Sequence, residues 1–185
     1  MPLPSPEPRE ELHHREIQMR GYRRADGLFD IEGRITDRKP QDFKLNIGTV
    51  VRRGDAIHDM SVRVTIDVDY NVTAAVACSD ATPYEICPTA AIKVQELVGL
   101  NMGRGWSRGV RERLQGTQGC THIIELLVVL GTVGFQSLVP FRTDHTPSPT
   151  NTKPPRIIDT CLGWAADGQA VTMLWPQHAR PPKTS

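Results

Sequence analysis

The chain has 185 residues, a formal net charge of +1 and 5% aromatic residues. A charge this close to zero provides no broad field to attract nucleic acid or an anionic membrane surface, and so few aromatic rings leave little for stacking on bases. No apolar run reaches the length of a membrane span, so we expect neither a nucleic acid nor a membrane as partner.

The length suits a single domain with a substantial core. Prolines mark its limits: we predict a disordered arm over residues 1–11, an exposed loop over 140–155 and a disordered tail over 176–185. Residues 12–175 are then expected to form one domain. Because the N-terminus lacks an apolar signal segment, we expect a cytoplasmic protein whose four cysteines are free thiols or metal ligands.

The first half of the chain predicts strands, because apolar and polar residues alternate there. The alternation covers residues 29–35 and 43–47 and is clearest over 60–68. A turn at 70–71 then allows residues 72–78 to return as an antiparallel partner.

The middle of the chain changes to helical spacing. We expect a first helix from about 88 to 99, a second between 107 and 116, and a third from near 121 to about 138. Strands followed by helices predict an α+β fold, with about three helices packed on one face of an antiparallel sheet.

The C-terminal part predicts a hairpin. Residues 157–165 and 170–175 flank Asp167-Gly168, a dipeptide that favours a two-residue turn between paired strands. This hairpin would be added to the central sheet and its helices.

The third predicted helix carries polar groups at its start. Cys120 precedes it, and His122 and Glu125 lie within a sector of about 80° on an otherwise apolar rod. The sector is either the solvated stripe of a core helix or the lining of a pocket. In a pocket, His122 and Glu125 would be acid–base residues, and the helix N-terminus would stabilise a Cys120 thiolate.

Three further residues are candidates on the strands and before the first helix. His58 shares the parity of Met60, so a regular strand turns it toward the core, as a structural histidine, a ligand or a proton-transfer residue. Asp59 then points to the opposite face unless the strand begins only at Met60. Cys87 is either a small buried hydrophobe or a thiol near a helix N-terminus.

Arginines gather around the second predicted helix. Arg104, Arg108 and Arg111 surround a single acid, Glu112, together with Arg113. They form either a solvated helix face or an anion site that receives a substrate carboxylate.

Seven blocks of the chain form a distinctive set: His-His-Arg (13–15), Arg-Gly-Tyr-Arg-Arg-Ala-Asp-Gly-Leu-Phe-Asp-Ile-Glu-Gly (20–33), His-Asp-Met (58–60), Pro-Tyr-Glu-Ile-Cys-Pro (83–88), Leu-Val-Gly-Leu (97–100), Gly-Trp (105–106) and Gly-Cys-Thr-His-Ile-Ile-Glu-Leu-Leu (119–127). Over roughly residues 12–175 the set resembles a family of bacterial proteins known as a domain of unknown function. This resemblance implies relatives without implying a reaction.

The order of possible ligands in residues 57–138 is similar to that of the U-type iron–sulfur cluster scaffold. Asp59 matches the aspartate of its Cys-Gly-Asp block, with Ile57-His58 in place of Cys-Gly. Cys87 matches the middle cysteine, and Cys120-Thr121-His122 stands where the scaffold has a His-Cys pair. The resemblance implies that these distant groups meet at one metal site, although one cysteine is replaced and the last pair is reordered.

Three functions remain open from the sequence. The first is a small enzyme doing acid–base or lyase-type chemistry on an organic acid or aromatic catabolic intermediate. His58, His122 and Glu125 would be its catalytic residues, and it would be either metal-free or dependent on Zn²⁺ or Fe²⁺. The expected metal ligands are Cys87, Cys120, His122, His58 and Asp59. The second is a metal or iron–sulfur carrier, and the third is a structural or partner-binding module; a homo-oligomer is compatible with all three.

Overall fold

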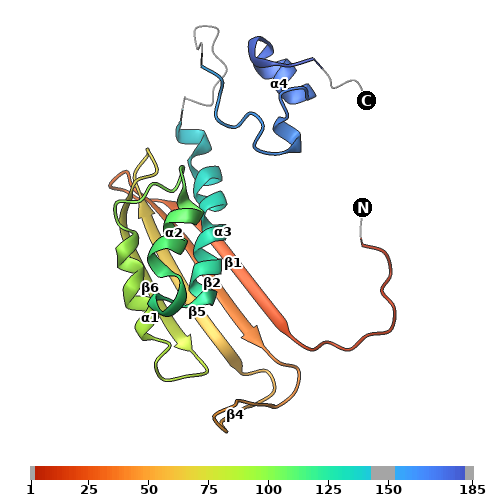
Figure 1. Cartoon of the computed structure of the whole chain (residues 1–185), viewed down its shortest axis with the longest axis vertical. Coiled ribbons are helices and arrows are strands. Elements are labelled where there is room, and N and C mark those ends of the chain that lie inside the picture. Colours follow the sequence, from red (N-terminus) through yellow and green to blue (C-terminus); the bar gives the residue numbers. More distant parts are fainter. Residues whose placement is uncertain (1–2, 143–152, 182–185) are drawn as a thin grey trace. The chain divides into compact units, whose positions relative to one another are not determined.

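A computed structural model describes residues 3–142 and 153–181, and the chain divides into two compact units, Met1–Leu138 and Val139–Ser185. The first unit contains a four-stranded sheet and three α-helices (Figure 1). Parts of the predicted arm, loop and tail lie outside the described residues, namely 1–2, 143–152 and 182–185.

The central sheet is antiparallel throughout, with the strand order β1-β2-β5-β6. Its strands are β1 (His14–Arg23), β2 (Phe29–Arg38), β5 (Ala56–Ile66) and β6 (Val72–Ala81). A separate short pair, β3 (Phe43–Lys44) and β4 (Val50–Val51), lies between β2 and β5 in the chain. The predicted return of 72–78 against the strand before it is confirmed, whereas the strand expected over 43–47 has only two residues.

Alternation sets which side of the sheet is buried. Ile31 and Ile35 on β2 and Met60 and Val64 on β5 are fully buried, because all four face the helices. The intervening residues are mostly polar and form the other face. The α+β prediction is confirmed: one face of the sheet carries the core and the other is hydrophilic.

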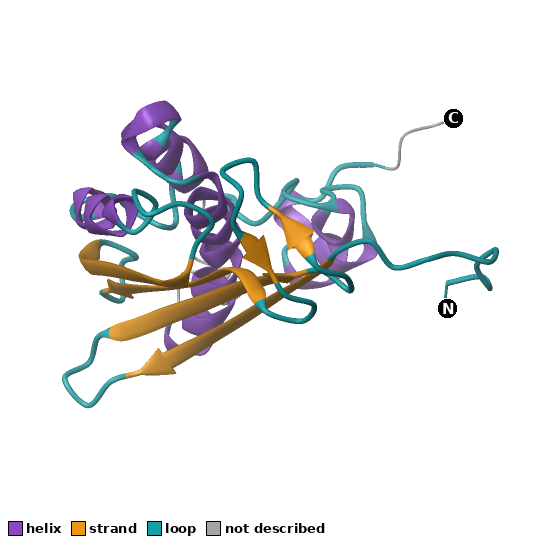
Figure 2. Cartoon of the chain, turned by 90° about the horizontal axis from the view of Figure 1, so that it is seen from below, coloured by secondary structure: helices purple, strands orange, loops and turns teal. Residues whose placement is uncertain are grey.

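The helices cover one face of the sheet (Figure 2). They are α1 (Thr89–Ile92), which continues as the 3₁₀ helix η1 (Lys93–Leu97), then α2 (Trp106–Leu114) and α3 (Thr121–Leu138), with the 3₁₀ turn η2 (Gly116–Gln118) between the last two. These bounds agree with the predicted helices to within a few residues. The second helix begins at Trp106, one residue earlier than predicted, and follows a left-handed Gly105.

The longest helix, α3, lies close to the sheet because β2 has a glycine beneath it. A Cβ added to Gly33 would lie 3.0 Å from Cδ1 of Leu126 and 3.3 Å from Cδ1 of Leu130. Even an alanine there would therefore require these leucine side chains to shift by a few tenths of an ångström. By length and composition alone, Thr121–Phe141 is apolar enough to cross a membrane. Its inner side chains instead form the core of a small globular unit, which is compatible with a soluble protein.

The second unit corrects a prediction. Instead of a terminal hairpin it contains the 3₁₀ helices η3 (Val139–Phe141), η4 (Leu162–Trp164) and η5 (Pro176–His178) and the helix α4 (Gln169–Leu174). Gly168 precedes α4 instead of forming a hairpin turn. Val171 and Trp175, four positions apart, are both buried, so helical spacing prevails over the alternation that a strand needs.

Candidate functional site

The centre of the site is Asp37, a residue that sequence reasoning missed. It is the last in a row of β2 residues that face the helices, after Ile31, Gly33 and Ile35, and its side chain is fully buried at 0% exposure. A carboxylate at this depth needs partners, because burying an unpaired charge is strongly unfavourable. The signal was present in the sequence: Asp37 has the parity of the buried isoleucines.

Sheet register supplies the first partners. Arg15 on β1 and His58 on β5 are the cross-strand neighbours of Asp37 on either side. The Arg15 guanidinium donates two bonds to the carboxylate, from Nε to Oδ1 at 2.7 Å and from Nη2 to Oδ2 at 2.8 Å. Nδ1 of His58 lies 3.0 Å from Oδ2, and Nε2 of His13, just before β1, lies 3.0 Å from Oδ1.

The start of α3 completes the cluster from above the sheet. Nε2 of His122 lies 3.5 Å from Oδ2 of Asp37, and its ring centroid lies 3.8 Å from that of His58. The second ring nitrogen, Nδ1, lies 3.7 Å from the sulfur of Cys120. Glu125, one turn into α3, accepts a bond from Nη1 of Arg15 at 2.8 Å. The structure thus brings together His58, Cys120, His122 and Glu125 from the predicted sites and adds Asp37, Arg15 and His13.

The charges of the cluster are strongly interdependent. Burial opposes ionisation of Asp37, but the hydrogen bonds and charge of Arg15, with help from His13, hold the pKa of this carboxyl well below its usual range. Burial and the neighbouring His122 lower the pKa of His58, although Asp37 acts in the opposite direction. A neutral His58 with its proton on Nδ1, toward Asp37, leaves Nε2 as a bare acceptor.

Both imidazoles remain accessible from outside. The side chain of His58 is 16% exposed and that of His122 is 22% exposed, whereas Asp37 behind them is sealed. The arrangement is a buried anion holding two partly accessible rings, and such rings are able to exchange protons with a bound molecule.

The metal ligands predicted from the sequence are only partly brought together. Among the described residues, Asp37, His58 and His122 have ligand atoms within 4.8 Å of one another and could hold an ion. Cys87, Cys120 and Asp59 are outside that group. Asp59 faces the opposite side of the sheet, as its parity predicted, where Arg34 holds it with bonds of 2.7 and 2.6 Å.

Among the arginines predicted to receive a substrate, those on α2 have their contacts within that helix and not with the cluster around Asp37. Arg108 pairs with Glu112 at 3.6 Å, and Arg111 bonds the carbonyl of Ser107 within the same helix. Trp106 at the start of α2 donates to the carbonyl of Leu127, so Arg104 and this end of α2 lie beside the middle of α3, past His122. Arg15 is the guanidinium that contacts the cluster.

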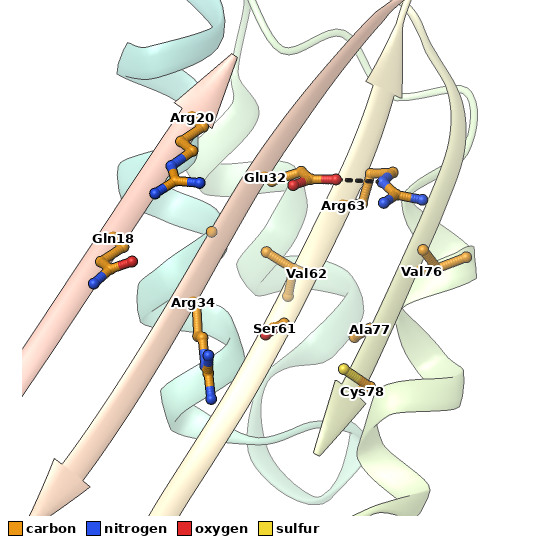
Figure 3. A pocket seen from close by; sticks show the side chains of 11 residues that line it. Gln18, Arg20, Glu32, Arg34, Ser61, Val62, Arg63, Val76, Ala77 and Cys78 are labelled. Atoms are coloured by element: carbon orange, nitrogen blue, oxygen red, sulfur yellow. Dashed lines mark hydrogen bonds and ion pairs between the residues drawn. The ribbon is translucent and has the colours of Figure 1, made fainter. Parts of the chain in front are cut away.

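The opposite face of the sheet carries a shallow hollow of about 410 Å³ (Figure 3). Its lining includes Arg20, Glu32, Arg34, Arg63 and Cys78. Glu32 accepts a bond from Arg63 at 2.7 Å, so these charges largely satisfy one another on a solvated surface. The buried cluster under α3 is the stronger candidate, because its central charge is withdrawn from water.

Comparison with protein families gives one match, and the matched segment contains the whole cluster. A family model described as "Protein of unknown function (DUF2889)" matches residues 13–136. The chain belongs to this family. The DUF2889 segment starts at His13 and includes Asp37 and His122, so every residue of the cluster lies inside it. No curated protein and no solved structure matches the chain.

The family expected from the sequence blocks is therefore confirmed. The likeness of residues 57–138 to the iron–sulfur scaffold stays a prediction.

Replacing Asp37 by Asn should destabilise this DUF2889 protein markedly. The change removes the buried anion that binds Arg15 through two bonds and leaves only the exposed Glu125 as its partner. Breaking a fully buried ion pair costs about 3–5 kcal/mol; since Arg15 is 32% exposed, we expect about 2–4 kcal/mol. Asp59→Asn is the matched control, because Arg34 binds Asp59 with the same two-bond geometry but is 54% exposed. Its loss of stability should be clearly smaller, because water already screens the guanidinium of that pair. Equal losses in urea denaturation would contradict the central role of Asp37.

The stability of the protein should fall as the pH drops from 7 toward 5. The pKa of His58 is lower in the folded chain than in the unfolded chain, so the unfolded state binds the proton first and acid favours unfolding. The contribution of a neutral His58 to the free energy of unfolding is fully present above the ordinary histidine pKa of about 6.5. It is lost as the pH falls from there through the pKa of His58 in the folded chain. His58→Gln should flatten the slope of the free energy of unfolding against pH, whereas His14→Gln, on the exposed side of β1, serves as control. An unchanged slope in His58→Gln would count against the buried, neutral ring.

Proposed function

We propose that the chain is a small cytoplasmic enzyme that carries out acid–base chemistry of the lyase or isomerase type on an organic acid or an aromatic compound. The observation that supports it is the buried carboxylate of Asp37 holding His58 and His122 at 3.0 and 3.5 Å. Structural ion pairs also perturb pKa values, but here the ion pair holds two imidazoles in ring contact, both of them partly open to solvent.

In this mechanism His58 is the base. Asp37 fixes the ring so that Nε2 faces away with a free lone pair, and it stabilises the imidazolium that forms when a proton is taken from the substrate. His122, in ring contact with His58, returns a proton at a second position. Two groups of unlike environment can in this way act as base and acid at one pH.

The remaining polar groups suit an anionic substrate. Arg15 and His13 line the edge of the cluster, and Glu125, whose side chain is 59% exposed, can leave Arg15 when a substrate carboxylate arrives. We assign the carboxylate to Arg15 instead of the arginines of α2, because Arg15 binds Asp37, the carboxylate that holds both imidazoles.

A metal-dependent version of the same enzyme is the second candidate. The ligand atoms of Asp37, His58 and His122 are close enough to share an ion whose bonds are about 2.0–2.2 Å. Against it, Arg15 already engages both oxygens of Asp37, and a cation there would face the guanidinium. A carrier of iron–sulfur clusters is supported less, since no thiol belongs to the group.

Genetic complementation tests the acid–base proposal without knowing the substrate. A strain lacking the gene should accumulate a metabolite that the wild-type gene removes, and His58→Gln and His122→Gln should each reduce its removal about 100-fold or more. His14→Gln is the matched control and should restore the wild-type level. Full complementation by both variants would exclude a catalytic role for these rings.

Elemental analysis distinguishes the metal-free enzyme from the metal-dependent one. We expect tag-free protein purified without chelators to contain far less than one Zn or Fe per chain. Extracts that contain the protein should still remove the accumulated metabolite after treatment with EDTA. A stoichiometric metal that is lost in Asp37→Asn would instead establish the metal-dependent version.

A further inference from the structure

The sulfur of Cys120 lies at the end of a line of three groups. It is 3.7 Å from Nδ1 of His122, and Nε2 on the other side of that ring is 3.5 Å from Oδ2 of Asp37. A thiol, an imidazole and a buried carboxylate in this sequence form the arrangement in which a base activates a nucleophile and a third group orients the base.

The local backbone also favours a negative sulfur. Cys120 immediately precedes α3, and the backbone N–H groups of His122 and Ile123 are directed at its side chain. Burial raises the pKa of the Cys120 thiol, but the hydrogen bond with His122 and these two N–H groups outweigh it and bring the pKa below its ordinary value. The thiol is half-buried, with Sδ of Met60 at 3.9 Å on its inner side.

The other cysteines lack this environment. Cys78 is on the hydrophilic face of the sheet and Cys161 is in the second unit, and both are exposed. Neither contacts an imidazole among the described residues. They provide internal references for ordinary thiol reactivity within the same chain.

We propose that Cys120 is a nucleophile that bonds covalently to the aldehyde or ketone carbon of a small substrate, with His122 as its proton partner and Asp37 as the group that positions His122. The inference deepens the proposed function and rests on it, since the two share Asp37 and His122. It adds a covalent step to what would otherwise be proton transfer alone.

The step is balanced and needs no other reactant. The proton of Cys120 resides on His122 as an imidazolium, and the thiolate sulfur attacks the carbonyl carbon. A C–S bond forms while the C=O π bond breaks, and its electron pair becomes an alkoxide. His122 returns its proton to that oxygen, which gives a neutral thiohemiacetal and a neutral ring. Nothing is oxidised or reduced, and the reverse sequence releases the substrate.

His58 then has a separate task within the same site. Its ring lies against His122, and its Nε2 has no hydrogen-bond partner among the described residues. It can therefore take a proton from the carbon skeleton while the substrate is tethered to sulfur. A covalent bond to sulfur holds the substrate in a fixed position relative to His58. Fixing two reacting groups in this way is one source of rate enhancement.

Alkylation by iodoacetamide tests the activated thiol directly on the full chain, without substrate. At pH 7, peptide mass mapping should show Cys120 reacting about ten times faster than Cys78 and Cys161, because a larger fraction of it is thiolate. In His122→Gln the rate of Cys120 should drop to that of Cys161 or below. A Cys120 that reacts no faster than the exposed thiols in the wild-type chain, or whose rate is unaffected in His122→Gln, overturns the proposal.

A near-isosteric substitution separates this inference from the acid–base function. Cys120→Ser should keep its circular dichroism and melting temperature, yet fail to complement the deletion strain, while the control Cys161→Ser complements fully. If Cys120→Ser complements and His58→Gln does not, the covalent step is wrong and the acid–base proposal stands. If His58→Gln and His122→Gln both complement, the proposed function itself is wrong, whatever the alkylation rates.

Discussion

The ion pair between Arg15 and Asp37 is the interaction on which the site depends. A carboxylate with no exposed surface loses several kcal/mol of hydration, and Arg15 offsets this through two short bonds to both of its oxygens. Because the two residues are cross-strand neighbours, their pairing also sets how the ends of β1 and β2 meet. His58, opposite Asp37 on β5, extends the same row to a third strand. One buried charge therefore organises one end of the sheet.

The two faces of the sheet carry the same kind of ion pair with different consequences. Arg34 and Asp59 repeat the bidentate geometry of Arg15 and Asp37, but they lie on the hydrophilic face with a largely solvated guanidinium. There water screens the guanidinium, so the pair is expected to contribute less to stability. Under α3 the surrounding side chains exclude water, so the same contact becomes a strong local field. Burial, more than residue type, distinguishes the candidate site from ordinary surface charge.

The position of α3 brings the proposed reacting groups to the buried charge of Asp37. Gly33 allows the helix to lie close to β2, and the helix start then places His122 over Asp37 and next to His58. Cys120 follows at the N-terminus of the same helix, where backbone N–H groups and the helix dipole favour an anion. A shift of α3 by one residue would turn His122 by about 100° and separate the thiol from the carboxylate. The proposed enzyme activity thus relies on tight packing some distance from the reacting groups.

The sequence by itself determined most strands and the helices of the first unit, although not β1, and the direction in which most of their side chains point. The parity of His58 and Asp59 correctly assigned them to opposite faces, and helical spacing correctly put His122 and Glu125 on one side of α3, because both follow from the periodicity of a single element. Asp37 was missed since an acidic residue at a strand end resembles a solvated one. The C-terminal hairpin was wrong because a run of six residues fits helix and strand spacing almost equally well. Which strand ends lie side by side, and which of them lie under the start of α3, was decided only by the tertiary structure: periodicity sets the face of a residue, whereas its lateral neighbours depend on strand register and helix packing between segments far apart in the chain.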